Sequence, residues 1–212
     1  FDLHSLPGLL SVVPAGTFHA LSQHLYVDRR GAPENFQGKF DLARKCAIHR
    51  AFAKTYGFSE EKIIVSEVNW PLKETGVYCP VDSPCILRGL WDERPNTEPC
   101  TVQRPRVSEE EYAKFLCRYV LLAVASGHVS RVYWWRLVHR GFGLVDDADA
   151  ENPRARPAFS ALKTLLAQLA GARFERRLDD VPAGAFALEF SRPDASRFIL
   201  RWTRETFPEI QR

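Results

Sequence analysis

The sequence has 212 residues, of which 45% are hydrophobic and 26% charged, and its formal net charge is +3. This is the composition of a soluble globular chain with room for one large domain or two small ones. The basic residues are scattered rather than arrayed with aromatic rings, so we expect no nucleic-acid partner. The longest apolar run, Tyr119 to Ala125, is too short for a membrane segment.

The five cysteines give no sign of a metal centre. Cys46 and Cys117 fall in apolar helical patterns, which is typical of buried thiols. Cys79, Cys85 and Cys100 share one loop and lack the paired C-x-x-C spacing of a zinc site. We therefore expect no metal and no other cofactor, while spacing alone leaves a Cys79–Cys85 disulfide open.

The first part of the chain alternates between helix and strand patterns. The opening DLHSLPGLLSVV has the pattern of the end of a helix, and Gly16 to Val27 reads as a strand. From Lys39 to Gly57 apolar residues recur at helical spacing before a closing glycine. Lys62 to Glu67 is then a short apolar strand that runs into a carboxylate.

A long connection with many prolines, Pro71 to Val107, follows this strand. It is well beyond the usual connection length, and loops of that size are often functional. We interpret it as an ordered lid over a substrate cleft, with Trp91 as its aromatic residue. A linker between domains is the alternative.

The alternation continues after this loop and then changes. Ser108 and Glu111 form a capping-box pattern that opens a helix, and Ser130 to Val138 is a further strand. An amphipathic helix begins at Pro157 and ends at glycine. Ala185 to Trp202 then alternates with period two around a turn, which predicts a β-hairpin.

Repeated strand and helix units predict an α/β fold with parallel strands and helical crossovers. A doubly wound sheet and a (β/α)8 TIM barrel both fit, but no Gly-rich phosphate loop follows a strand, which counts against a nucleotide-binding domain. A complete barrel needs eight units and about 250 residues. We therefore predict half a barrel over residues 1–172, and a β-hairpin that starts a small appended β-domain over residues 173–212.

Polar and aromatic residues gather where the predicted strands end, the edge at which barrels place their active sites. These candidates are His24, Tyr26, Glu67, Asn69, Trp70, Trp134, Trp135 and Arg136. Aromatic planes, hydrogen-bonding groups and a carboxylate are what a sugar substrate requires. The pattern thus predicts a carbohydrate-binding cleft with Glu67 as its reactive group.

Structural roles compete with this interpretation. A glutamate at a strand end is often only solvated or salt-bridged, and His24 has the pattern of a core histidine as much as of a site residue. Adjacent strand residues face opposite ways, so one of Trp134 and Trp135 is expected to pack in the interior. Two explanations are open for a set of basic residues, which are either a cationic rim for an acidic glycan or solvated loop charges. The set is Arg29, Arg30, Arg136, His139 and Arg140.

Three motifs, in order, resemble a clan of retaining glycoside hydrolases with a (β/α)8 barrel and catalytic glutamates after strands four and seven. HLYVDRRGAP is similar to the sixth strand of a bacterial branch of that clan, and IIVSEVNWP to the seventh. SRVYWWRLVHRGFGLVDD with RPAFSALKTLLAQLAG resembles the eighth strand and the closing helix. The resemblance covers Phe1 to Ala172 and implies the C-terminal half of the barrel.

The resemblance also implies roles for individual residues. Glu67 aligns with the nucleophile, and His24 and Tyr26 align with residues that hold the nucleophile or the sugar. Trp134 matches the tryptophan that forms a platform beneath the sugar, with Trp135 as the fallback. The implied activity is hydrolysis of a poly- or oligosaccharide in a bacterium, with the cytoplasm favoured over the periplasm.

One departure from the clan concerns its acid/base glutamate, which follows strand four behind an asparagine. No Asn-Glu pair occurs in this sequence, which opens at Phe1 and contains no methionine. We therefore expect the acid/base upstream, no activity from this piece alone, and barrel edges covered by an N-terminal fragment or a second copy. The alternative function is a non-catalytic glycan-binding or scaffold protein.

Overall fold

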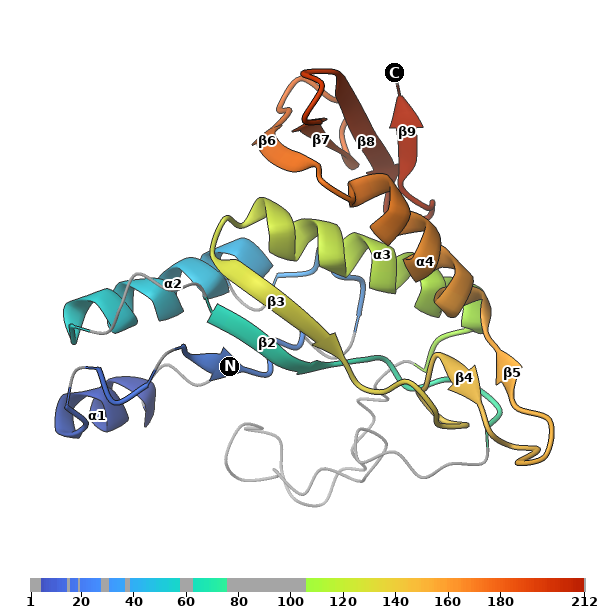
Figure 1. The fold of residues 1–212 in the computed structure, drawn as a ribbon, viewed down its shortest axis with the longest axis horizontal. Coiled ribbons are helices and arrows are strands. Elements are labelled where there is room, and N and C mark those ends of the chain that lie inside the picture. Colours follow the sequence, from blue (N-terminus) through green and yellow to red (C-terminus); the bar gives the residue numbers. More distant parts are fainter. Residues whose placement is uncertain are drawn as a thin grey trace, which may run out of the picture.

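The computed structural model describes residues 5–14, 16–18, 20–27, 31–36, 39–57, 63–75 and 106–211 (Figure 1). The first elements are α1 (Ser5–Val12), β1 (Ser22–Gln23), α2 (Leu42–Thr55), β2 (Ile63–Val68), α3 (Glu109–Ala125) and β3 (Val129–Trp134). Then follow β4 (Val145–Asp146), β5 (Arg154–Ala155), α4 (Pro157–Leu169), β6 (Arg173–Arg177), β7 (Ala185–Ser191), β8 (Arg197–Thr203) and β9 (Glu209–Gln211). The chain is therefore of the α/β class.

The first three strands form a parallel sheet in the order β1-β2-β3, so β2 is central. This confirms the predicted parallel strands with helical crossovers. Strand β1 is shorter than predicted, because only Ser22 and Gln23 pair with β2. The sheet is open, and the described residues contain no closed barrel.

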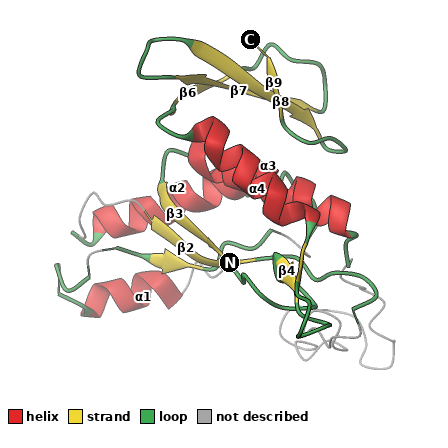
Figure 2. Ribbon diagram, turned by 45° about the vertical axis from the view of Figure 1, so that its right-hand side comes forward, coloured by secondary structure: helices red, strands yellow, loops and turns green. Residues whose placement is uncertain are grey.

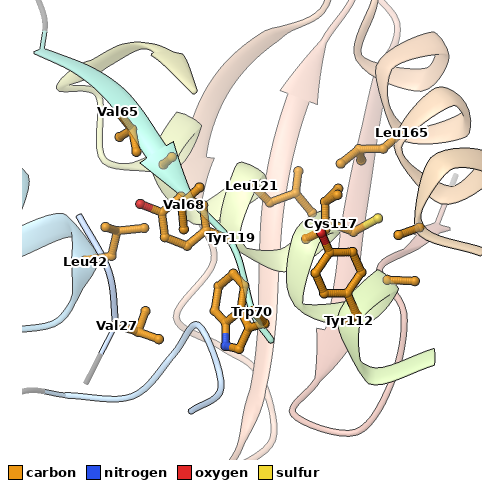
Figure 3. Packing of buried hydrophobic residues seen from close by; sticks show 14 of the residues in the cluster. Val27, Leu42, Val65, Val68, Trp70, Tyr112, Cys117, Tyr119, Leu121 and Leu165 are labelled. Carbon is orange, nitrogen blue, oxygen red and sulfur yellow. The ribbon is translucent and has the colours of Figure 1, made fainter. Parts of the chain in front are cut away.

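Helices α2 and α3 cover one face of the parallel sheet (Figure 2). Ile63, Val65 and Val68 of β2 are 0% exposed and share one core with α2 and α3. In Figure 3, Leu42 of α2 and Tyr119 and Leu121 of α3 are drawn with Val65 and Val68 of β2 in this cluster. The opposite face of the sheet is therefore the one left for polar side chains.

Local signals define where the helices begin. Ser108 and Glu111 form the predicted capping box at the start of α3, with reciprocal bonds between side chains and backbone. The Asp41 carboxylate accepts a bond from the Arg44 N–H at the start of α2. Pro157 stands at the first position of α4, as predicted.

The last four strands form an antiparallel sheet in the order β6-β7-β8-β9. Strands β7 and β8 are the predicted hairpin, to which β6 and β9 add one strand on each side. Helices α3 and α4 lie between this sheet and the parallel sheet (Figures 1 and 2). Leu188, Phe190, Leu200 and Trp202 of its inner face belong to the same core as β2.

Only the two ends of the predicted lid are described. Leu72 and Val107 form a parallel bridge, with the Val107 N–H donating to Pro71 O and the Lys73 N–H to Val107 O. Trp91 and the three loop cysteines lie outside the described residues, so the lid and the disulfide stay predictions. No helix in the described ranges is long and apolar enough to cross a membrane.

Candidate active site

Glu67 lies at the C-terminal end of the central strand β2, as predicted. Strict alternation would turn it toward the helices together with Ile63 and Val65, but the strand pairing shifts between Val65 and Val68. The same step spans only Val132 to Trp134 on β3, so β2 carries one extra residue, a β-bulge. Val68 thereby returns to the helix side, and Glu67 is left on the open face.

Partners of Glu67 come from the segment that begins with β1. The Tyr26 hydroxyl donates a hydrogen bond to Glu67 Oε1, and His24 Nδ1 lies 3.8 Å from the same oxygen. The His24 and Glu67 side chains are 55% and 28% exposed, so both reach solvent. The structure thus brings together three of the predicted site residues, one from β2 and two from the segment that follows β1.

Alternating burial explains why His24 and Tyr26 face the open side. Leu25 and Val27 are 2% and 5% exposed and belong to the core beneath the sheet. The buried Tyr119 hydroxyl donates to Leu25 O at 2.8 Å, and Lys45 Nζ donates to Tyr26 O at 3.2 Å. Helices α2 and α3 therefore hold the backbone at Leu25 and Tyr26, on the tyrosine side of the Tyr26–Glu67 contact.

The structure corrects the prediction that Trp70 binds substrate. Its side chain is 0% exposed, and its indole N–H donates to Gly31 O at 2.9 Å. Figure 3 shows the ring within the core, in the cluster that includes Tyr119 and Val27. Asn69 is also buried, at 6%, so neither residue is presented to a ligand on the open face of the sheet.

The two adjacent tryptophans on β3 have different environments, and the structure reverses the predicted preference between them. The Trp134 ring stacks on Trp70 with centroids 5.6 Å apart, and its N–H donates to the Tyr112 hydroxyl at 2.6 Å. It therefore packs between sheet and helices and does not form a platform. Trp135 is 43% exposed, and its backbone N–H donates to Val68 O, beside the strand end that bears Glu67.

Other groups on the open face were not predicted as site residues. The Ser22 hydroxyl donates to Ser66 Oγ at 2.6 Å, which joins β1 to β2 just before Glu67. Tyr133 is 50% exposed, two residues before Trp135 and hence on the same face of β3. The period-two step from Tyr133 to Trp135 was the signal that could have identified this exposed aromatic pair.

Arg136 is exposed, and its guanidinium carbon lies 6.0 Å from the Trp135 ring centroid, with Nε donating to Val138 O. His139 serves the loop structure, because its Nδ1 accepts from the Gly141 N–H and its ring stacks on Phe142. Burial and the neighbouring arginines hold the pKa of His139 below its usual range. The neutral ring therefore adds no positive charge to a rim around Arg136.

Beyond β3, the chain is organised around the buried guanidinium of Arg156, which is 1% exposed. It donates to Glu109 Oε1 at 2.9 Å and to the carbonyls of His139, Arg140 and Gly143, and it pairs with Asp146 at 3.1 Å. The hydrogen bond from Arg154 outweighs burial and holds the pKa of Glu109 below its usual range. A hollow of about 240 Å³ lies beside this ion-pair cluster, bordered by Lys73, Glu74 and Arg140 among others.

The geometry around Glu67 is suited to chemistry at a carboxylate. One oxygen is fixed by a phenolic donor, a histidine lies within reach, and an exposed aromatic ring stands near the strand end. In the described residues, no group of three or more His, Cys, Asp and Glu side chains is arranged to hold a metal ion.

Comparison with known proteins reveals a similar fold but no family to which the chain can be assigned. No family model matches the sequence, and no curated protein is significantly similar to it. A solved structure described as a family 39 glycoside hydrolase from the gut symbiont Bacteroides cellulosilyticus WH2 is similar, with a TM-score of 0.58 and 15% sequence identity. The similarity covers 87% of this chain and 34% of that enzyme, so the chain shares the fold of about a third of a glycoside hydrolase.

Proposed function

We propose that this chain carries the nucleophile of a retaining glycoside hydrolase, with Glu67 as the attacking group. The observation that carries the proposal is the position of Glu67 on the open face at the C-terminal end of the central strand, with Tyr26 bonded to Oε1. Barrel enzymes place their catalytic residues at this edge of the sheet. The similar fold of a family 39 glycoside hydrolase supports the same activity class.

The bond from Tyr26 assigns different tasks to the two carboxylate oxygens. Because Oε1 is held by the phenol, Oε2 is the oxygen left to attack the anomeric carbon and form a glycosyl ester. A second carboxyl group about 5–5.5 Å away protonates the departing oxygen and then activates water, which releases the sugar with retained configuration. We propose that this group comes from a segment outside the described residues.

Sugar contacts in this proposal come from the same open face. Trp135 supplies an aromatic surface for stacking, and His24 supplies a hydrogen-bonding group near Glu67. Trp70 and Trp134 take no part, since their rings pack in the core. The substrate in this proposal is a carbohydrate. Its sugar and linkage are selected by residues outside those described.

We further propose that additional β/α units, from the same protein or from a second copy, cover the two ends of the sheet. Among the described strands, β1 and β3 are the two edges of the parallel sheet, and sheet edges present backbone groups that can pair with a further strand. The helices at the two ends carry exposed apolar side chains, Leu9 at 52% and Val12 at 77% on α1, and Leu166 at 54% on α4. Where the cover is a further part of the same protein, it also supplies the second carboxyl group, and residues 1–212 alone should then not hydrolyse glycosides.

The test compares Glu67→Gln with Glu74→Gln in the full-length protein on a panel of activated aryl glycosides. Glu74 is a second glutamate close in sequence, exposed and beyond the strand end, and it serves as the matched control. Glu67→Gln should reduce turnover by several orders of magnitude, because it removes the covalent step, while Glu74→Gln retains it. Near-normal turnover by Glu67→Gln would overturn the assignment.

A non-catalytic glycan-binding protein is the second candidate. It is favoured by one observation, that Glu67 is the only carboxylate that the described residues place at the end of the parallel strands, on the open face. In that case the full-length protein turns over no substrate in the panel, but retains glycan binding that Trp135→Ala weakens.

A further inference from the structure

Glu34 is a buried carboxylate at the junction of three elements that are distant in sequence. Its side chain is 1% exposed, and its Oε1 lies 3.1 Å from Arg118 Nε of α3 and accepts the Trp202 indole N–H of β8 at 2.9 Å. Burying a carboxylate is costly unless it is paired and hydrogen-bonded, so these contacts fix the segment that carries Glu34.

The C-terminal sheet is fastened at the same junction. The Arg118 guanidinium also donates to the carbonyls of Thr203 and Arg204, at the end of β8. Arg204 in turn reaches Asn35 Oδ1 at 3.4 Å, one residue after Glu34. Residues 31–36 are thus joined to both α3 and the C-terminal sheet.

The other end of this segment reaches the candidate active site. Trp70, three residues after Glu67, donates its indole N–H to Gly31 O at 2.9 Å. Tyr26, five residues before Gly31, donates its hydroxyl to Glu67. The segment 31–36 therefore contacts the C-terminal sheet through Glu34 and Asn35, and the end of β2 through Gly31.

We propose that Glu34 is a positioning residue, through which the C-terminal sheet holds Glu67 against Tyr26. Trp202 and Arg118 fix the Glu34 carboxylate, and Glu34 fixes the segment 31–36. Gly31 O of this segment accepts the indole N–H of Trp70, so the segment holds the end of the strand that bears Glu67. The sheet is then part of the site and not a separable appendage. The importance of this coupling for catalysis rests on the proposed function of Glu67, but the coupling itself does not.

The test uses the full-length protein with tyrosine labelled by ¹³C at Cζ, whose chemical shift reports the hydrogen bond of each phenol. Tyr26→Phe identifies the Tyr26 signal, and Glu67→Gln shows how far the signal moves when the charged acceptor is lost. The probing variant is Trp202→Phe, which removes the N–H donor to Glu34 but keeps an aromatic ring to stack on Phe186.

Phe198→Leu is the matched control, because Phe198 lies on the same strand, is equally buried at 2% and stacks on Phe190 without contacting Glu34. We expect Trp202→Phe to move the Tyr26 signal measurably toward its Glu67→Gln position, and Phe198→Leu to leave it in place. An unmoved signal in Trp202→Phe, or equal movement in the control, would overturn the proposal. If Trp202→Phe does not fold, Glu34→Gln is judged by the same criteria.

This readout is independent of turnover. If the Tyr26 signal responds as expected while Glu67→Gln leaves hydrolysis intact, the coupling stands and the proposed nucleophile is wrong. If the signal does not respond while Glu67→Gln abolishes hydrolysis, the nucleophile stands and the role of Glu34 is wrong.

Discussion

Replacing Arg156 with lysine should destabilise the protein strongly, although the charge is kept. The Arg156 guanidinium donates four hydrogen bonds, to the Glu109 carboxylate and three backbone carbonyls, and it also pairs with Asp146 at 3.1 Å. A lysine offers three donors, so at least two of these five contacts are lost. At about 1.5–3 kcal/mol for each hydrogen bond from a charged group, the loss is roughly 3–6 kcal/mol.

Arg154→Lys is the control for this reasoning. Arg154 binds the same two carboxylates, of Glu109 and Asp146, but its side chain is 55% exposed. Exposed ion pairs contribute about 1 kcal/mol or less, so this variant should behave almost like the wild type.

Thermal and urea unfolding followed by tryptophan fluorescence measure both variants. For a chain of 212 residues, a loss of about 3 kcal/mol lowers Tm by roughly 6–12 °C. Arg154→Lys should shift Tm by no more than about 4 °C. Equal shifts in the two variants would refute the argument that burial and the number of contacts make Arg156 the centre of this cluster.

Three further outcomes are expected. Tyr26→Phe should lower kcat of the full-length protein by about 100-fold with little change in Tm, since it removes one donor to the reacting carboxylate. Trp135→Ala should weaken glycan binding without unfolding, whereas Trp134→Ala should cost about 3–5 kcal/mol of stability, as judged by titration and urea unfolding. Glu109 has a pKa lowered from 4.5 in the folded protein, chiefly by Arg154. Its ion pairs therefore stabilise the folded protein at neutral pH, and this stabilisation should fade as the pH falls below about 4.5. Below that pH, the Tm of Glu109→Gln should depend less on pH than the Tm of the wild type.

The features that sequence predicted well are those set by local physics. The capping box of Ser108 and Glu111 and the proline at position 157 mark helix starts in the structure as in the sequence. Gly57 and Gly171 follow helices with φ of 73° and 68°, values that favour glycine. These signals act within a few residues, so no knowledge of distant partners was needed.

The face of Glu67 could not be derived from the strand pattern. Alternation from Ile63 and Val65 turns Glu67 toward the helices, and only the bulge before Val68 restores it to the open face. A bulge depends on how β2 pairs with β3, which the residues of β2 alone do not reveal. The position of Glu67 was predicted from the strand end that carries it and from the resemblance, and not from the alternation along β2.

The tryptophans show the same limit. Period two requires Trp134 and Trp135 to face opposite ways, but which of them faces the helices is decided by the ring of Trp70 and the hydroxyl of Tyr112. Strand β6 was missed for a related reason, because RFERR has no apolar alternation and becomes a strand by pairing with β7. Tertiary partners decide such cases.

The central claim, that Glu67 is a nucleophile, is tested most directly by trapping its covalent intermediate. The full-length protein is incubated with a panel of activated 2-deoxy-2-fluoro glycosides, which slow hydrolysis of a glycosyl ester, and is then digested and analysed by mass spectrometry. We predict a mass increase of one fluoroglycosyl group on the peptide that contains Glu67, and no such label in Glu67→Gln. Efficient hydrolysis of the parent glycosides with the label on a different carboxylate would contradict it.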